Sequence, residues 1–325
     1  MTDISFKGFF EGIKGKTICV VGDFIVDHYR TLTVKGVSPE SPTLMFRPSK
    51  DEYRPGGAGN VCANLRAWGV KSHVMTVIGD GHFPLEHDGI GMVCEKGRLT
   101  TTKERLLTRR QQLMRVDIQS DREITRASAD ELLRKALCFM EGTDAIVFSD
   151  YAHGVCVPNL IIPLMQKAIS MGIPTVVDSK ARDSLSKYFG CTIMLPNQKE
   201  ARLIAGFGDE FEDEHVARFL LRKLRSKALG LTLGPDGIML FTEGKTHFPA
   251  LNEDTDHEVT DVTGAGDTVS AIVAAGLVLG WPLAPIMKLA NVAAGTKVQK
   301  MGVATPLPDE IVSEGEKRGI RLLEE

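Results

Sequence analysis

The sequence predicts an α/β protein, a three-layer α/β/α sandwich with a mostly parallel central sheet and a small β-sheet lid. Short apolar strands alternate with longer helical patterns along most of the chain, which is typical of a parallel sheet covered on both faces. Residues 29–53 and 99–118 break this pattern, because polar and apolar residues alternate there as in exposed antiparallel strands. We expect these two segments to form the lid. No linker rich in Gly, Ser or Pro divides the chain, so residues 1–325 are expected to form a single domain.

The first expected elements lie before residue 80. Residues 17–21 form a compact β-type run that ends in Gly-Asp, and residues 59–68 have a helical pattern closed by Gly69. Residues 73–78 form the next apolar strand and again end in Gly-Asp.

The rest of the chain repeats this alternation. Amphipathic patterns predict helices at 130–140 and 160–170, with Gly172 beyond the end of the second. The expected strands are short and apolar and end at a polar residue, a proline or a glycine: 145–148, 175–177, 192–195 and 229–233. An almost unbroken apolar run at 271–279 predicts a buried helix.

Polar residues or glycine follow nearly every expected strand. They are Asp23, Asp80, Asp150, Asp178, Asn197 and Gly234. Ligands bind at this edge of an open α/β sheet. Asp, Asn and Gly also make good turns, and any one of them alone would indicate no more than that. Six at one edge favour a ligand site.

Composition excludes several classes of protein. The chain is 43% hydrophobic and 25% charged with a formal net charge of −3, as in a folded enzyme, and nucleic acid is not an expected partner. No apolar stretch is long enough to span a membrane, and the N-terminal residues do not form a secretory signal. The six cysteines are scattered without a Cys-x-x-Cys pair, so we expect reduced thiols and a cytoplasmic location.

The most informative segment is residues 261–270, Asp-Val-Thr-Gly-Ala-Gly-Asp-Thr-Val-Ser, which leads into the apolar run. Gly264 and Gly266 allow a tight turn, and the free N–H groups from Gly264 through Ala265 and Gly266 would form an anion hole at a helix N-terminus. A carboxylate here repels a phosphate, so Asp267 needs another task, such as taking a proton or holding a metal ion. The alternative is that Asp267 only caps the helix.

A second glycine group, Pro-Gly-Gly-Ala-Gly-Asn at 55–60, lies just before the helical pattern that continues from Val61. Its Gly-Gly-x-x-x-Asn element resembles the N-terminal signature of the ribokinase-like (PfkB) carbohydrate kinases, and residues 261–268 resemble their C-terminal signature. The resemblance covers essentially the whole chain. It implies a ribokinase-like fold and an ATP-dependent sugar kinase, with Asp267 accepting the proton of the acceptor hydroxyl.

Five further segments are similar to the bacterial heptose 7-phosphate kinases: 22–29, 38–42, 54–60, 110–117 and 149–154. This resemblance implies phosphorylation of the anomeric hydroxyl of D-glycero-D-manno-heptose 7-phosphate, on the way to ADP-heptose for lipopolysaccharide. Many such kinases are fused to a nucleotidyltransferase. Because this chain stops at Glu325, we expect that second activity to need another protein.

Hydrogen-bonding and cationic residues are the candidates for the acceptor side. The resemblance assigns sugar binding to Asp27, Gly56, Gly57 and Asn60, with Asp23 either helping or serving only as a turn residue. Cations that would meet a substrate phosphate are Lys103, Arg105 and Lys180. We expect Arg109 and Arg110 to be solvated surface charges.

The resemblance assigns the nucleotide side to other residues. Asn197 and Glu200 match an Asn-x-x-Glu element linked to Mg²⁺, with Glu200 acting through water, and they also match a capping box. The remaining nucleotide residues are Thr232, Gly234 and Gly237 at the triphosphate and Asn291 at the adenine. Asp261 and Thr263, with the segment 297–305, match a site that encloses a monovalent cation such as K⁺.

One segment departs from the family pattern. Residues 81–101 lack the helix expected there and are rich in helix breakers, which leaves the identity of the sugar open. His82 and His87 have no third ligand at suitable spacing and are interpreted as loop residues. The alternatives are a kinase for another sugar or nucleoside, or a catalytically silent homologue. We expect a homodimer that pairs through the lid.

Overall fold

The structure is a computed structural model that describes residues 3–81, 84–85, 91–108, 111–120, 122–180, 185–249 and 260–323. Two of the expectations concern residues outside the described ranges. They are the surface charges at Arg109 and Arg110 and the loop residues His82 and His87. So does much of the segment 81–101, of which the structure describes residue 81, residues 84–85 and residues from 91 onward.

The central sheet has nine strands within the described part of the chain, in the order β13-β12-β11-β10-β9-β8-β1-β4-β5. These strands are β1 (Thr17–Gly22), β4 (Lys71–Gly79), β5 (Met92–Glu95), β8 (Ala145–Asp150), β9 (Thr175–Ser179), β10 (Ile193–Met194), β11 (Ala228–Thr232), β12 (Ile238–Phe241) and β13 (Lys245–Phe248). Neighbours pair in parallel from β5 to β11, and only β11–β12 and β12–β13 pair antiparallel. The mostly parallel sheet expected from the sequence is confirmed.

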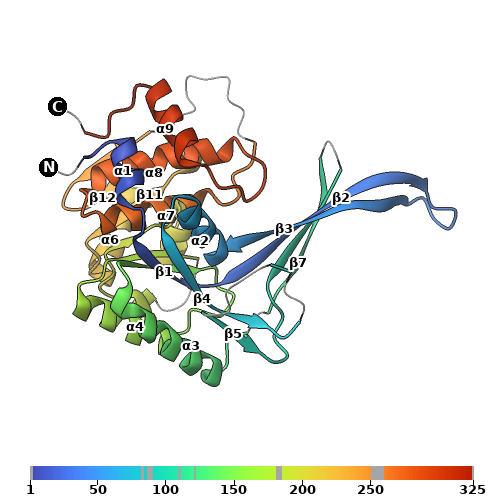
Figure 1. The fold of residues 1–325 in the computed structure, drawn as a ribbon, viewed down its shortest axis with the longest axis horizontal. Coiled ribbons are helices and arrows are strands. Elements are labelled where there is room, and N and C mark those ends of the chain that lie inside the picture. Colours follow the sequence, from blue (N-terminus) through green and yellow to red (C-terminus); the bar gives the residue numbers. More distant parts are fainter. Residues whose placement is uncertain are drawn as a thin grey trace.

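Helices cover both faces of this sheet (Figure 1). One hydrophobic cluster contains the buried faces of α1 (Phe6–Gly12), α2 (Ala58–Ala67), α7 (Ala265–Val278), α8 (Leu283–Val298) and α9 (Pro308–Lys317). A second cluster contains those of α3 (Arg126–Phe139), α4 (Pro158–Met171), α5 (Gln198–Ala205) and α6 (Asp213–Leu224). Strand β1 shows the division, since Ile18 and Val20 belong to the first cluster and Cys19 and Val21 to the second. The two clusters make three layers, as expected.

Four strands form a smaller sheet in the order β3-β2-β6-β7, again among the described residues. They are β2 (Phe24–Val37), β3 (Leu44–Gly57), β6 (Thr102–Leu107) and β7 (Gln112–Ile118). The pairs β2–β3 and β6–β7 are antiparallel, but β2 and β6 pair in parallel, which the alternating pattern did not indicate. In Figure 1 this small sheet extends away from the helices, and β2 and β3 reach furthest.

The two sheets join next to the expected ligand edge. Strand β2 begins one residue after β1 ends, so Asp23 stands at the junction, and β3 leads directly into α2 through Gly57. The left-handed φ of Gly57, 56°, allows this change of direction, and a Cβ there would come within 2.5 Å of the Asp23 carbonyl oxygen. All six cysteines are free thiols, as expected. No described helix is at once long and apolar enough to cross a membrane.

Candidate active site

The turn before α7 places a carboxylate at the start of a buried helix. Gly264 is the N-cap, with a left-handed φ of 84°, and the helix begins at Ala265. Asp267 therefore lies within the first turn and is not the cap, so the alternative that it only caps the helix is wrong. A Cβ on Gly264 would approach the Asn60 Nδ2 atom to 2.6 Å, so glycine is needed both for the turn and for this neighbour. The N–H groups of Gly266 and Asp267 lie in the first helical turn, where backbone donors have no partner within the helix. The Ala265 N–H instead donates to the Val262 carbonyl at 3.2 Å, so the expectation that it belongs to an anion hole is wrong.

Two side chains donate hydrogen bonds to the Asp267 carboxylate, which is only 2% exposed. Asn60 Nδ2 donates to Oδ2 at 2.7 Å, and the Tyr151 hydroxyl donates to Oδ1 at 2.8 Å. Asn64 in turn donates to Asn60 Oδ1 at 3.3 Å and to the Asn60 carbonyl at 2.8 Å, which fixes the amide. Burial raises the pKa of Asp267, although both donors oppose the rise. The carboxylate is thus oriented and desolvated.

Tyr151 was not among the residues assigned a role from the sequence. It follows β8 at the ligand edge, and its backbone N–H donates to Asp23 Oδ2 at 2.8 Å. Asp23 also accepts from the N–H groups of His153 at 3.1 Å and Val155 at 3.0 Å. The Asp23 carboxylate is therefore used in shaping the loop after β8, and Asp23 is not among the residues that line the cavity described next. Burial, reinforced by the nearby Asp150, raises the pKa of Asp23 to about 6.

Asp267 faces a cavity of about 550 Å³ between the two sheets. Most of the residues singled out in the sequence line it: Asp27, Gly57, Lys103, Arg105, Lys180, Asn197, Glu200, Thr232, Gly234, Gly237, Thr263, Gly264, Ala265, Gly266, Asp267 and Asn291. Four other predicted site residues are not among those that line it: Asp23, Gly56, Asn60 and Asp261. A single cavity thus gathers residues from both sheets and from the start of α7.

On the small-sheet side, Asp27 and Arg105 form a buried ion pair across the parallel strands β2 and β6. The two residues are 3% and 7% exposed. Burial raises the pKa of Asp27 even though the Arg105 guanidinium opposes the rise. Gly56 leaves room for this carboxylate, because a Cβ there would come within 2.1 Å of Asp27 Oδ2. Arg105, expected to meet a substrate phosphate, is engaged with Asp27 in this structure.

Two lysines approach the ring of Tyr151. Lys180 Nζ lies 3.9 Å from the ring centroid and Lys103 Nζ 5.5 Å from it. Burial lowers the pKa of Lys103. Arg115, on β7, also lines the cavity and pairs with Asp117 at 2.8 Å, although the sequence reasoning assigned it no role. The side of the cavity next to the small sheet therefore carries several cationic side chains, of which Arg105 and Arg115 are paired with carboxylates.

The side of the cavity opposite the small sheet is formed by the strand ends of the large sheet. Asn197 and Glu200 form a complete capping box at the start of α5, with two reciprocal 2.9 Å hydrogen bonds. Gly234 and Gly237 have positive φ angles of 63° and 89° in the turn after β11. On α8, Asn291 donates to the Pro249 carbonyl at 2.7 Å. The capping box expected for Asn197 and Glu200 is confirmed, and both residues also line the cavity.

Acidic groups on this side suit a hydrated cation. Asp178, at the end of β9, lines the cavity and accepts from Ser270 Oγ at 3.3 Å. Burial raises its pKa to about 7, with Glu200 and Asp267 adding to the rise and Lys180 opposing it. Within the described ranges, no three His, Cys, Asp or Glu side chains are grouped closely enough to hold a metal directly. Carboxylates that face a cavity without forming a cage fit Mg²⁺ that keeps its waters.

The expected monovalent-cation residues have protein partners. Asp261 Oδ1 accepts from Thr263 N and Oδ2 from Gly302 N, both at 2.8 Å. Lys297 Nζ donates to the Asp261 carbonyl at 2.7 Å. Burial lowers the pKa of Lys297 to about 8, and the charges of Asp261 and Asp267 oppose the decrease.

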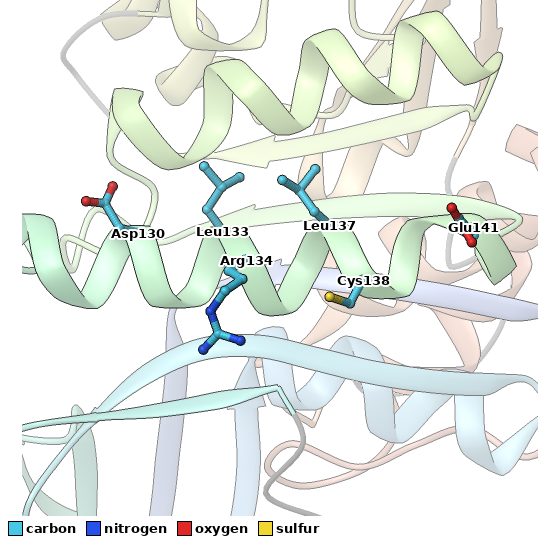
Figure 2. Close-up of a pocket in the computed structure, with 6 residues that line it drawn as sticks. All are labelled: Asp130, Leu133, Arg134, Leu137, Cys138 and Glu141. Atoms are coloured by element: carbon cyan, nitrogen blue, oxygen red, sulfur yellow. The ribbon is translucent and has the colours of Figure 1, made fainter.

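A second hollow lies along the outside of α3 (Figure 2). Its residues are Asp130, Leu133, Arg134, Leu137, Cys138 and Glu141. Figure 2 shows Leu133 and Leu137 pointing to one side of the helix and Arg134 to the other. All six come from one helix and the turn after it, and none was singled out from the sequence. We therefore place the chemistry in the cavity at Asp267.

Comparisons with known proteins agree with the resemblance seen in the sequence. A family model described as pfkB family carbohydrate kinase matches residues 16–310. A bifunctional protein HldE of Citrifermentans bemidjiense is 37% identical over 321 residues, which cover 95% of this chain and 65% of that protein. A bifunctional protein HldE of Campylobacter jejuni is 36% identical over 302 residues, which cover 91% and 64%. This chain thus spans slightly less than two thirds of the length of these relatives.

Solved structures show the same fold at low identity. Arabidopsis thaliana ribokinase, complexed with ribose and ATP, has a TM-score of 0.67 and 17% identity and covers 92% of this chain and 98% of its own. Escherichia coli phosphofructokinase-2, in complex with potassium, has a TM-score of 0.73 and 16% identity and covers 94% and 99%. The ribokinase-like fold expected from the sequence is confirmed.

Proposed function

Because the chain belongs to the pfkB family of carbohydrate kinases, we propose that it transfers the γ-phosphoryl group of ATP to a hydroxyl of a sugar phosphate. An ATP-dependent sugar kinase follows from the family. The finer part of the proposal is the acceptor, D-glycero-D-manno-heptose 7-phosphate, with its anomeric hydroxyl as the nucleophile. The segments similar to heptose 7-phosphate kinases and the relatives named HldE support this acceptor.

One observation carries the proposal: Asp267 is a buried, doubly hydrogen-bonded carboxylate at the N-terminus of α7, facing a cavity with cations on one side and glycine turns on the other. In phosphoryl transfer most of the catalytic effect comes from positioning and electrostatic stabilisation, with a carboxylate orienting the nucleophile. Asp267 accepts the proton of the attacking hydroxyl. Asn60 and Tyr151 hold its two oxygens so that one lone pair of each stays free for the substrate.

The N–H groups at the start of α7 receive the transferring phosphoryl group. Gly266 and Asp267 present backbone donors there, and the positive end of the helix dipole adds to them. Gly266 carries no Cβ that would keep the phosphoryl group away from the backbone. These donors are fixed before the reaction, so they need little reorganisation as charge develops.

The nucleotide occupies the side formed by Asn197, Thr232, Gly234, Gly237 and Asn291. Glu200 and Asp178 would hold Mg²⁺ through its waters, since the carboxylates that line the cavity form no cage among the residues that the structure describes. The ion would supply positive charge to offset that of the phosphates. Asn291 offers an amide to the adenine from α8, and its fixed contact with the Pro249 carbonyl orients it.

The acceptor occupies the side next to the small sheet. Asp27 accepts hydrogen bonds from sugar hydroxyls, and the Arg105 guanidinium stabilises the charged form of this buried carboxylate. Lys103 and Lys180, both near the Tyr151 ring, meet the phosphate of the substrate. A neutral sugar would offer these cations no negative charge, which favours a phosphorylated acceptor. An intact base and a complete cavity argue against a silent homologue.

We also propose that the small sheet acts as a lid and pairs two copies of the chain. Several large apolar side chains of this sheet are exposed: Val34, Val37, Leu44, Leu113, Met114, Val116 and Ile118. Apolar surface of this kind on a sheet is stabilised when a partner covers it. Analytical ultracentrifugation should give twice the mass of the chain, and a variant with Met114→Glu and Val116→Glu should sediment as a monomer. A wild-type monomer would contradict this assignment.

The acceptor is tested with an ATP-consumption screen. Wild-type enzyme with Mg²⁺ and ATP is assayed against heptose 7-phosphate, the same heptose without phosphate, and other sugars, sugar phosphates and nucleosides. We expect the highest kcat/KM on heptose 7-phosphate and a value at least tenfold lower on the unphosphorylated heptose. A preference for a neutral sugar or a nucleoside would contradict the assignment of the acceptor while leaving the kinase class intact.

A further inference from the structure

The loop that leads into α7 is held against the segment after α8 by an extensive hydrogen-bond network. The backbone N–H groups of Thr260 and Asp261 both donate to the Val298 carbonyl, at 2.8 and 3.1 Å. Gly302 N returns a hydrogen bond to the Asp261 carboxylate at 2.8 Å. Because residues 261–264 continue directly into α7, this network determines where Gly266 and Asp267 stand.

Cationic side chains bind the backbone carbonyls of this network. Lys297, in the last turn of α8, is 0% exposed, and its ammonium donates to the Asp261 carbonyl at 2.7 Å and lies 3.5 Å from the Lys300 carbonyl. Arg54, from β3, donates to the carbonyls of Met301 and Val303, both at 3.3 Å. Backbone carbonyl oxygens are the groups that bind K⁺ in proteins, and here lysine and arginine take them.

A monovalent cation does not fit beside the Lys297 ammonium. An ion on the Asp261 carbonyl would lie close to the ammonium on the same oxygen, and two like charges that share one buried oxygen repel each other strongly. The Asp261 carboxylate is also committed, to Thr263 N and Gly302 N. The expectation that Asp261 and Thr263 hold K⁺ therefore disagrees with the donors present.

We infer that the Lys297 ammonium is the resident cation of this loop and that the enzyme needs no monovalent metal ion for activity. The covalently attached charge neutralises the carbonyl dipoles and the Asp261 carboxylate, and it holds the 261–264 turn in the position that α7 requires. The inference about activity rests on the proposed kinase function, whereas the inference about the loop rests on its hydrogen bonds alone.

The test compares the wild type with Lys297→Met, which keeps an unbranched apolar side chain and removes the charge. Activity is measured with ATP and Mg²⁺ in tetramethylammonium chloride and in KCl at equal ionic strength. Wild-type kcat/KM should change less than twofold between the two salts. Lys297→Met should lose at least tenfold in tetramethylammonium chloride and recover in part with KCl or NH₄Cl, because a small cation can then reach the vacated carbonyl.

A matched control is Lys288→Met, which removes another lysine of α8 whose Nζ donates to the Arg321 carbonyl, away from the loop. It should behave as the wild type in both salts. Thermal unfolding is a second readout that needs no sugar: KCl should raise the Tm of Lys297→Met above its value in tetramethylammonium chloride and leave the wild-type Tm unchanged. If no acceptor is ever phosphorylated, the proposed function fails, but the Tm comparison still decides about the loop.

Three results would overturn the inference. The first is a wild type that KCl activates tenfold or more or stabilises measurably. The second is a Lys297→Met variant that is fully active without K⁺ or NH₄⁺. The third is a folded, inactive Lys297→Met variant that neither ion activates or stabilises. If Lys297→Met does not fold, the wild-type salt comparison decides alone.

Discussion

Replacing Asp267 by Asn changes the charge of the proposed base and little else. The side chains have nearly the same volume, and the site is 2% exposed, so solvent cannot rearrange around the change. The amide oxygen can still accept from Asn60 Nδ2, now at 2.7 Å from the carboxylate. The amide NH₂ then faces the Tyr151 hydroxyl, which can rotate and accept instead of donating. The fold therefore tolerates Asp267→Asn.

The expected loss is catalytic. A positioned proton acceptor contributes about 10²- to 10⁴-fold in rate, so kcat of Asp267→Asn should fall by at least about 10²-fold. ATP affinity should change less than about threefold, because the groups assigned to the nucleotide lie at the ends of other strands. Removing a buried carboxylate also relieves its desolvation, which offsets the loss of two charge-assisted hydrogen bonds, and unfolding free energy should shift by about 1 kcal/mol or less.

The assay couples ADP formation to NADH oxidation, with calorimetry of a non-hydrolysable ATP analogue and urea unfolding as companions. Asp144→Asn is the matched control, because Asp144 accepts the Thr17 N–H at 2.8 Å away from the cavity. It should lose some stability and no catalytic rate. An Asp267→Asn variant within tenfold of the wild-type kcat would refute the assignment of the base. Lost ATP binding would instead place Asp267 in the nucleotide site.

Three further changes probe its surroundings. Tyr151→Phe removes a donor to the ionised Asp267, so the pKa of Asp267 should rise further. Because activity is lost as pH falls through this pKa, the acid limb of the kcat/KM profile should move to higher pH. An acid limb that does not move would exclude Tyr151 as a positioning residue. Lys180→Met should raise KM for a phosphorylated acceptor at least tenfold and leave KM for ATP unchanged in steady-state kinetics; a change confined to ATP would contradict the assigned phosphate contact. Arg105→Met leaves the Asp27 carboxylate buried without its partner and should lower the free energy of unfolding in urea by about 3 to 5 kcal/mol. The control Arg115→Met removes an exposed ion pair and should lower it by about 1 kcal/mol or less. Equal losses would show that the buried pair contributes no more to stability than the exposed one.

The parts of the site that the sequence predicted are those set by local patterns. Strand–helix alternation indicated the layers, and the glycine turn at 261–267 indicated a carboxylate at a helix N-terminus. These features depend on residues close together in the chain, which is why hydrophobic periodicity and turn chemistry reveal them. The capping box at Asn197 and Glu200 is local in the same way.

The parts that the sequence did not predict depend on long-range pairing. Tyr151 reaches Asp267 because its loop is tied to Asp23, 128 positions earlier in the chain. Arg105 was counted as a free cation, but the parallel pairing of β2 with β6 brings it to Asp27. The Lys297 contact with Asp261 forms where the end of α8 meets a loop 36 positions earlier. Spacing along the chain carries no signal for such contacts.

The central claim is that a sugar phosphate next to Asp267 receives the γ-phosphoryl group of ATP, and ³¹P NMR of the reaction mixture tests it most directly. With wild-type enzyme, Mg²⁺, ATP and D-glycero-D-manno-heptose 7-phosphate, we expect the ATP γ-phosphate signal to be replaced by those of ADP and of a second sugar-bound phosphate that couples to the anomeric proton. ADP with inorganic phosphate and no new sugar-bound phosphate, or a new phosphate on another carbon, would contradict it.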